Sequence, residues 1–132
     1  MSKIHQEVTF AAPPAKVYGA LMSSAEHAAF TGAPAEISRD EGGAFSAHGG
    51  RVHGRNLELV PDARIVQAWR LSDWPAGIYS IVRFELHGEG GGTRLVFEHE
   101  AMPEAAAVHL EAGWKRMYWD PLSKHLEAQS AA

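Results

Sequence analysis

The segment IYSIVRFELHGEGGGTRLVFEHEA, residues 78–101, decides the fold. Its first part, 78–87, alternates strictly, and one side of it is formed by Ile78, Ser80, Val82, Phe84 and Leu86. A period of two is typical of a half-buried β-strand. Glycines follow at 88–92, and a second alternating run over 93–101 places Leu95, Phe97 and His99 together. Two such runs joined by a short Gly-rich turn predict an antiparallel hairpin.

Further strands precede this hairpin. Residues 52–60 and 64–71 are runs of strand character, and turn residues follow each of them. Residues 3–11 alternate as well, and shorter strands are expected at 36–39 and 44–47. Because consecutive strands joined by short turns pair antiparallel, the sequence predicts one antiparallel sheet of about six to seven strands.

Sequence patterns typical of helices follow the first strand and the last strand. Pro13 and Pro14 end the first strand and suit the first turn of a short helix. Ser23 and Glu26 have the spacing of a capping box, which predicts a second short helix over about 24–30. The remainder, about 104–129, reads as one long helix. This order predicts a single α+β domain, 1–132, in which the long helix packs on one face of the sheet over a cavity.

The long helix contains an unusual aromatic segment, GWKRMYWDPL at 113–122. If each residue advances by about 100° around the helix axis, several side chains fall within about 60° of Trp114 and form one stripe. It contains Leu110, Met117, Tyr118, Pro121 and His125. Leu122, Leu126 and Trp119 fall at about 80°, 120° and 140°, so the apolar arc is far wider than the ~100° that a surface helix needs. The pattern predicts that Trp119 faces a loop, another protein or a second copy of the chain, and Pro121 predicts a kink.

The composition excludes several classes of protein. The chain is 45% hydrophobic and 21% charged, has no cysteine, and carries a net charge of −4. No apolar run approaches the ~20 residues that cross a bilayer, and the start MSKIHQEVTF lacks the pattern of a secretion signal. Basic residues are scattered, which disfavours nucleic-acid binding. We therefore expect a cytoplasmic protein without membrane insertion, either a monomer or a homodimer.

Several motifs together resemble one family. They are GGAF (42–45), GRNLELVP (54–61), RIVQAWR (64–70), SDWPAGIYS (72–80), GGTRLVFEH (91–99) and GWKRMYWDPLSKHL (113–126). Their order is similar to that of the START-like, helix-grip (SRPBCC) superfamily, and within it to the C-terminal domain of the activator of the ninety-kilodalton heat-shock chaperone ATPase. The resemblance implies a curved sheet that grips the C-terminal helix over an apolar cavity.

The same resemblance implies two lines of function. Many members of the superfamily bind apolar small molecules in the cavity, and the chaperone activator, a stress-response protein, contacts the chaperone's nucleotide-binding domain. Some other members are cyclases or hydrolases. The full activator has a further N-terminal domain for which these 132 residues leave no room, and Phe30 stands where the family often has a tryptophan. A non-enzymatic domain that binds a small hydrophobic ligand is our first hypothesis. A chaperone-binding module is the alternative, and a cyclase- or hydrolase-type enzyme is the lesser alternative.

We expect the ligand to contact inward residues of the strands and helices. They are Phe30, Phe45, Trp69, Trp74, Tyr79, Val82, Phe84, Leu95, Phe97, His99, Trp114, Met117 and Tyr118. The competing interpretation is that the same residues fill a core, and that His99 is a hydrogen-bonded core histidine. Trp119 is the candidate for contact with a protein partner.

Motifs of catalysis and metal binding are weak. The chain has no G-x-S-x-G, and the Gly-rich segment 88–93 lies between strands, whereas phosphate loops lead into a helix. His53 and His99 have no metal-ligand spacing, and Glu98 and Glu100 point to the face opposite His99. We expect no catalytic residue, no metal and no cofactor, and we expect Arg83, Glu85 and Glu98 to form cross-strand pairs on the solvated face.

Overall fold

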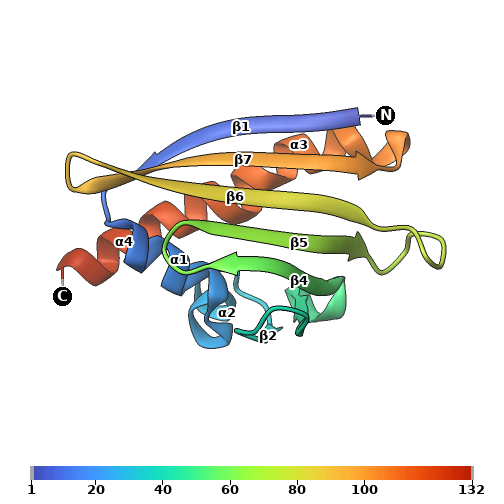
Figure 1. The fold of residues 1–132 in the computed structure, drawn as a ribbon, viewed down its shortest axis with the longest axis horizontal. Coiled ribbons are helices and arrows are strands. Elements are labelled where there is room, and N and C mark those ends of the chain that lie inside the picture. Colours follow the sequence, from blue (N-terminus) through green and yellow to red (C-terminus); the bar gives the residue numbers. More distant parts are fainter. Residues whose placement is uncertain (1, 132) are drawn as a thin grey trace.

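A computed structural model, which describes residues 2–131, shows one antiparallel sheet of seven strands (Figure 1). The strands are β1 (Ser2–Phe10), β2 (Glu36–Ile37), β3 (Ala44–Ala47), β4 (Val52–Val60), β5 (Arg64–Leu71), β6 (Ser80–Glu89) and β7 (Gly92–Met102). Their order across the sheet is β1-β7-β6-β5-β4-β3-β2. Apart from β1, every strand therefore lies beside its neighbour in the sequence, as the hairpins predicted.

The helices follow the predicted order too. Two short ones, α1 (Pro14–Met22) and α2 (Ser24–Thr31), come after β1, and α3 (Ala107–Trp114) and α4 (Asp120–Ala131) run one after the other across the sheet (Figure 1). Short 3-10 turns lie at His48–Gly50 and Glu104–Ala106. The Ser23 hydroxyl accepts a hydrogen bond from the Glu26 amide at 3.1 Å, so the predicted cap of α2 is present. The α+β helix-grip fold is confirmed.

The core lies between the sheet and the C-terminal helices. Val82, Leu95 and Phe97 are fully buried there, and Phe97 packs on Trp114 with ring centroids 4.3 Å apart. Alternation along β6 is as predicted, but the strand begins at Ser80. Ile78 belongs to the preceding loop, because its carbonyl oxygen is held by the buried guanidinium of Arg70 at 3.5 Å.

The C-terminal helix is not a regular α-helix. Between α3 and α4, residues Lys115–Trp119 form a π-helical turn, in which the Asp120 amide bonds to the Lys115 carbonyl. Such a turn takes in one extra residue, so later side chains are rotated back by about 100°. Trp119 thereby moves to about 40° from Trp114, and Leu122 and Leu126 to within about 20° of it. The expected wide apolar arc is in fact one narrow stripe.

The prediction that Trp119 faces a different partner from Trp114 is wrong. Trp119 is only 4% exposed, stacks on Trp114 at 5.8 Å, and donates its indole N–H to Gln6 Oε1 at 2.6 Å. Pro121, which lacks an amide hydrogen, is the second residue of α4 and lies two residues after the π-helical turn. With Trp119 buried, it is not a contact residue for a protein partner or for a second copy.

Candidate functional site

An open groove of about 670 Å3 runs beside the C-terminal helix. Its walls come from the 3-10 turn His48–Gly50, the end of β5, the loop 72–79, and the helical segments between Glu104 and Tyr118. Trp74 and Trp114 contribute the large apolar surfaces, and Gly113 leaves the helix side open. A volume of this size lies within the range of small-molecule sites. The groove is therefore the candidate binding site.

The interior of the core, by contrast, is nearly filled. The cavity there measures only about 20 Å3, room for roughly one water molecule. Aromatic rings occupy the rest, with Trp114 and Tyr118 centroids 4.5 Å apart and Phe84 and Phe97 centroids 5.2 Å apart. The open volume thus lies at one end of the space between sheet and helix, where Trp69 and Leu71 of β5 and Gly113 of the helix line it, and aromatic side chains fill the interior.

The predicted ligand-contacting residues consequently separate into three sets. Those on the groove are Trp69, Trp74, Trp114, Met117 and Tyr118. Those on the small interior cavity alone are Phe45 and Phe84. The remaining six, Phe30, Tyr79, Val82, Leu95, Phe97 and His99, line neither space. Tyr79 is 46% exposed on the loop, whereas the other five are core residues, as the competing interpretation expected.

Arg70 fixes the loop that forms one groove wall. This guanidinium is 93% buried, since its exposed fraction is 7%, and it donates to the carbonyl oxygens of Trp74 at 2.6 Å and Pro75 at 3.1 Å. Its charged end also lies 5.6 Å from the centre of the Tyr79 ring, a cation–π distance. Charge-assisted hydrogen bonds are stronger than neutral ones, so Arg70 holds Trp74 at the groove. Sequence reasoning missed this role, although an arginine directly before a turn could have suggested it.

His99 belongs to a buried hydrogen-bonded chain behind the groove. The Trp114 indole donates to His99 Nδ1 at 3.0 Å, and His99 Nε2 lies 2.6 Å from Ser80 Oγ, whose hydroxyl donates to the Trp69 carbonyl at 3.0 Å. This arrangement places the imidazole hydrogen on Nε2. Burial lowers the pKa of His99 to about 3, so the ring is neutral at pH 7. The chain fixes the indole ring of Trp114, and the His99 ring packs against the ring of Trp69 with centroids 4.9 Å apart. Both tryptophans line the groove.

A second buried histidine sits where α2 meets the C-terminal helix. His27 Nε2 lies 3.1 Å from the Tyr118 hydroxyl, and its Nδ1 is buried with no hydrogen-bond partner among the described residues. Burial, assisted by nearby His48, lowers the pKa of His27 to about 4. Burial also raises the pKa of Tyr118 well above its ordinary value. Both rings are therefore neutral at pH 7 and act as packing groups joined by one hydrogen bond.

Charged side chains at the groove were not predicted. Arg51, Asp73 and Arg116 line it, together with His48 and His109. A signal existed in the sequence, since His109, Gly113 and Arg116 have the i, i+4, i+7 spacing of one helix face. The aromatic stripe on the same helix is the stronger pattern and obscures this spacing.

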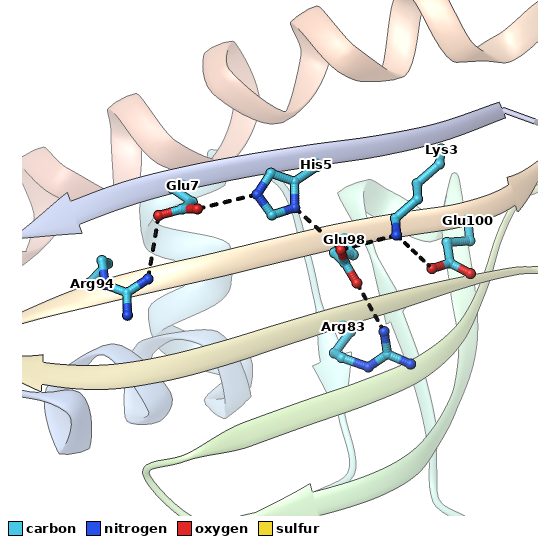
Figure 2. A network of polar contacts seen from close by, with 7 residues as sticks. All are labelled: Lys3, His5, Glu7, Arg83, Arg94, Glu98 and Glu100. Atoms are coloured by element: carbon cyan, nitrogen blue, oxygen red, sulfur yellow. Dashed lines mark hydrogen bonds and ion pairs between the residues drawn. The ribbon is translucent and has the colours of Figure 1, made fainter.

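The opposite face of the sheet carries a network of ion pairs (Figure 2). Glu98 on β7 is its centre and contacts Lys3, His5 and Arg83, each at 3.2 Å. Arg64 also pairs with Glu85 at 3.5 Å, so the predicted cross-strand pairs are present. Exposed pairs of this kind contribute little stability each. Within residues 2–131 no three histidine, aspartate or glutamate side chains are grouped as metal ligands.

No helix in the described part of the chain is both long enough and apolar enough to span a bilayer.

Comparison with known proteins connects this fold to chaperone activators. A family model described as Activator of Hsp90 ATPase homolog 1-like protein matches residues 11–127. The human Activator of 90 kDa heat shock protein ATPase homolog 1 is 31% identical over 122 residues, which make up 92% of this chain and 36% of that protein. The Dictyostelium discoideum homolog is 32% identical, over 92% of this chain and 32% of that protein. The chain thus spans about a third of the length of the curated relatives it matches.

A solved structure extends the comparison to the whole fold. The HSP90 activator from Plasmodium falciparum superposes with a TM-score of 0.91, covering 96% of this chain and 97% of that chain at 21% identity. At this identity the likeness shows a shared fold. Together with the family model it confirms the resemblance that the motifs indicated.

Proposed function

The chain belongs to the Activator of Hsp90 ATPase homolog 1-like family, and from that premise we propose that it is a non-catalytic domain that binds an Hsp90-type chaperone. The observation that carries the proposal is the 92% coverage of this chain by relatives named as activators of that ATPase. Because this chain spans about a third of those relatives, the proposal concerns binding by this domain, and its effect on the ATPase rate is to be measured.

The loop 72–79 is the surface that we assign to the chaperone. Ile78 is 40% exposed and Tyr79 46% exposed, side by side in the chain, while Arg70 holds the loop from beneath. Exposed apolar groups on a fixed loop offer a contact that needs little ordering on binding. Tyrosine is also enriched among the residues that dominate binding energy at interfaces. This surface replaces Trp119, which the fold buries.

The test is binding to the Hsp90 of the same organism, measured by calorimetry, and the rate of its ATP hydrolysis. The double variant Ile78→Ser and Tyr79→Ser should weaken binding at least tenfold, which is the effect of losing about 1.4 kcal/mol at a contact. A matched control is Leu57→Ser, which removes an equally exposed apolar residue, 51% exposed on β4. Absence of binding by the unaltered protein, or equal weakening by the control, would contradict the proposal.

A second candidate function is binding of a small apolar ligand, and the open groove of about 670 Å3 is the observation that favours it. Native mass spectrometry of protein purified gently from its own host should show a stoichiometric added mass. Gly113→Leu should remove that mass by filling the groove, because a Cβ at Gly113 meets no atom within 4 Å and the helix accommodates leucine. An added mass that persists in this variant would place the ligand elsewhere.

A further inference from the structure

Two arginines at the groove have no partner of their own. Arg51 follows the 3-10 turn His48–Gly50, and Arg116 lies in the π-helical turn Lys115–Trp119. Both are exposed and both line the groove. Neither guanidinium makes an ion pair or a side-chain hydrogen bond with any residue of the described chain, whereas Arg64, Arg83 and Arg94 all pair with glutamates. The groove therefore presents free donors that suit an oxyanion.

The charge along the groove favours an anion. Against the two arginines, Asp73 is the only carboxylate among the lining residues that the structure describes. Burial and the neighbouring Arg51 lower the pKa of His48, so this histidine adds no charge at pH 7. With His109 counted as neutral, the lining carries one net positive charge, although the chain as a whole carries −4. An anion is thus attracted here against the sign of the molecule as a whole.

The rest of the lining is apolar. Trp74 and Trp114 are 8% and 3% exposed and supply ring surfaces, and Val52, Leu71 and Met117 extend them. A ligand that uses the whole groove consequently needs an apolar body and one charged end. Neither a purely apolar molecule nor a free inorganic anion satisfies both parts of the lining.

We propose that the groove binds a small amphipathic organic anion, with its apolar body against Trp74 and Trp114 and its acidic group at Arg51 and Arg116. The inference rests on the proposed ligand-binding function and specifies the ligand class for it. A guanidinium group at the groove can donate charge-assisted hydrogen bonds to the oxygens of such an acidic group.

Two dyes that differ by a single anionic group provide the test. 8-Anilinonaphthalene-1-sulfonate has a naphthalene body with a sulfonate, and N-phenyl-1-naphthylamine is the same body without it. Their emission should rise on binding, and calorimetry should give one site. We expect the sulfonate to bind about fivefold to tenfold more tightly than the neutral dye, as exposed charge-assisted contacts allow.

Variants locate the site and the charge effect. Arg51→Gln with Arg116→Gln should abolish the preference for the sulfonate and leave the neutral dye's affinity unchanged. Lys16→Gln with Lys124→Gln is the matched control, since it changes the net charge equally at two exposed positions outside the groove lining. Gly113→Leu should block both dyes, and Ala105→Phe, at an exposed lining position, repeats that test independently. Circular dichroism confirms that each variant is folded.

The outcomes distinguish failure of the anion inference from failure of the ligand-binding function. If both dyes bind equally and Gly113→Leu blocks them, the groove function stands and the anion inference fails. The inference also fails if the lysine control reduces the preference as much as the arginine variant does. If the groove-filling variants bind both dyes normally, or if neither dye binds the unaltered protein, the ligand function and the anion inference fail together.

Discussion

Asn56 is a fully buried amide in β4, and its side chain joins a loop to the sheet. Its Nδ2 donates to the carbonyl oxygens of Ser38 at 2.7 Å and Asp40 at 3.2 Å, and its Oδ1 accepts from Gln67 Nε2 at 3.0 Å. Leu57, the next residue, is the extra residue of a β-bulge and is exposed. Asn56 lies on the inward face by the regular alternation that also buries Val52, and the bulge reverses this alternation only after Asn56.

Replacing this amide should be costly. We expect Asn56→Ala to lower the free energy of unfolding by about 2–4 kcal/mol, because it removes three hydrogen bonds and leaves the Gln67 amide buried without its partner. The measurement is urea unfolding, in which the slope of the free energy of unfolding against urea concentration should stay unchanged. Arg55→Ala serves as the control, since the exposed Arg55 also bonds to the same loop, at the Gly42 carbonyl, and should cost under about 1 kcal/mol. Equal effects of the two variants would contradict the argument.

Individual residues show which positions can be predicted from the sequence and which cannot. Phe84 and Phe97 were assigned to the inner face from alternation alone, and both are buried. Asn56 was within a recognised motif, but a buried amide needs hydrogen-bond partners, and its partners Ser38, Asp40 and Gln67 come from other segments that no local pattern connects to it. Arg51 and Arg116 are distant in the sequence, so nothing in their local patterns indicated that they line one groove.

Among the elements, the C-terminal helix departs furthest from expectation. Apolar periodicity predicts its existence and its place after the strands, whereas the angles expected for Trp119, Leu122 and Leu126 assume a regular α-helix and are wrong. A π-helical turn has no reliable sequence pattern, although two overlapping apolar stripes and a following proline are consistent with one. The hairpins were predicted closely because their pattern depends only on neighbouring residues.

Deleting one residue tests whether the π-helical turn contains one extra residue. Removing Lys115, which is exposed, should convert the turn to regular α-helix while Trp114, Trp119 and Leu122 stay on the same face. We expect this variant to keep the fold, with a free energy of unfolding within about 1–2 kcal/mol of the original.

A deletion elsewhere in the same helix provides the comparison. Removing the exposed Lys124 from α4 rotates Leu126, which is 3% exposed, by about 100° out of the core. Loss of a buried leucine contact costs about 2–5 kcal/mol, so this variant should be clearly the less stable one in thermal or urea unfolding. If the Lys115 deletion is the more damaging of the two, the interpretation of the π-helical turn as one extra residue is wrong.

For the whole molecule, the two buried histidines make stability depend on pH. His27, beside Tyr118 and His48, has its pKa lowered to about 4, and His99, between Ser80 and two indoles, has its pKa lowered to about 3. In the unfolded chain both should titrate near 6.5. Between these values the unfolded chain binds more protons than the folded one, so the free energy of unfolding falls as the pH falls below 6.5.

The expected loss between pH 7 and pH 5 is about 2 kcal/mol for each histidine. His27→Gln should roughly halve the slope of stability against pH, because glutamine carries no charge at any pH in this range. His109→Gln, at an exposed position, should leave the slope unchanged. His5 acts in the opposite direction, since Glu7 and Glu98 raise its pKa, but it is fully exposed on the sheet. A slope that does not respond to His27→Gln would show that other groups control acid unfolding.

The four tryptophans are all buried and form an unbroken row: Trp74 to Trp69 at 5.8 Å, Trp69 to Trp114 at 5.7 Å, and Trp114 to Trp119 at 5.8 Å between ring centroids. At such separations an excited indole passes its energy to the next ring much faster than it emits light. Light absorbed by Trp119, deep beneath the sheet, is therefore emitted from the whole row, and its polarisation is largely lost. Because Trp74 stands at the open end, any molecule that settles beside it should alter the luminescence of all four rings at once.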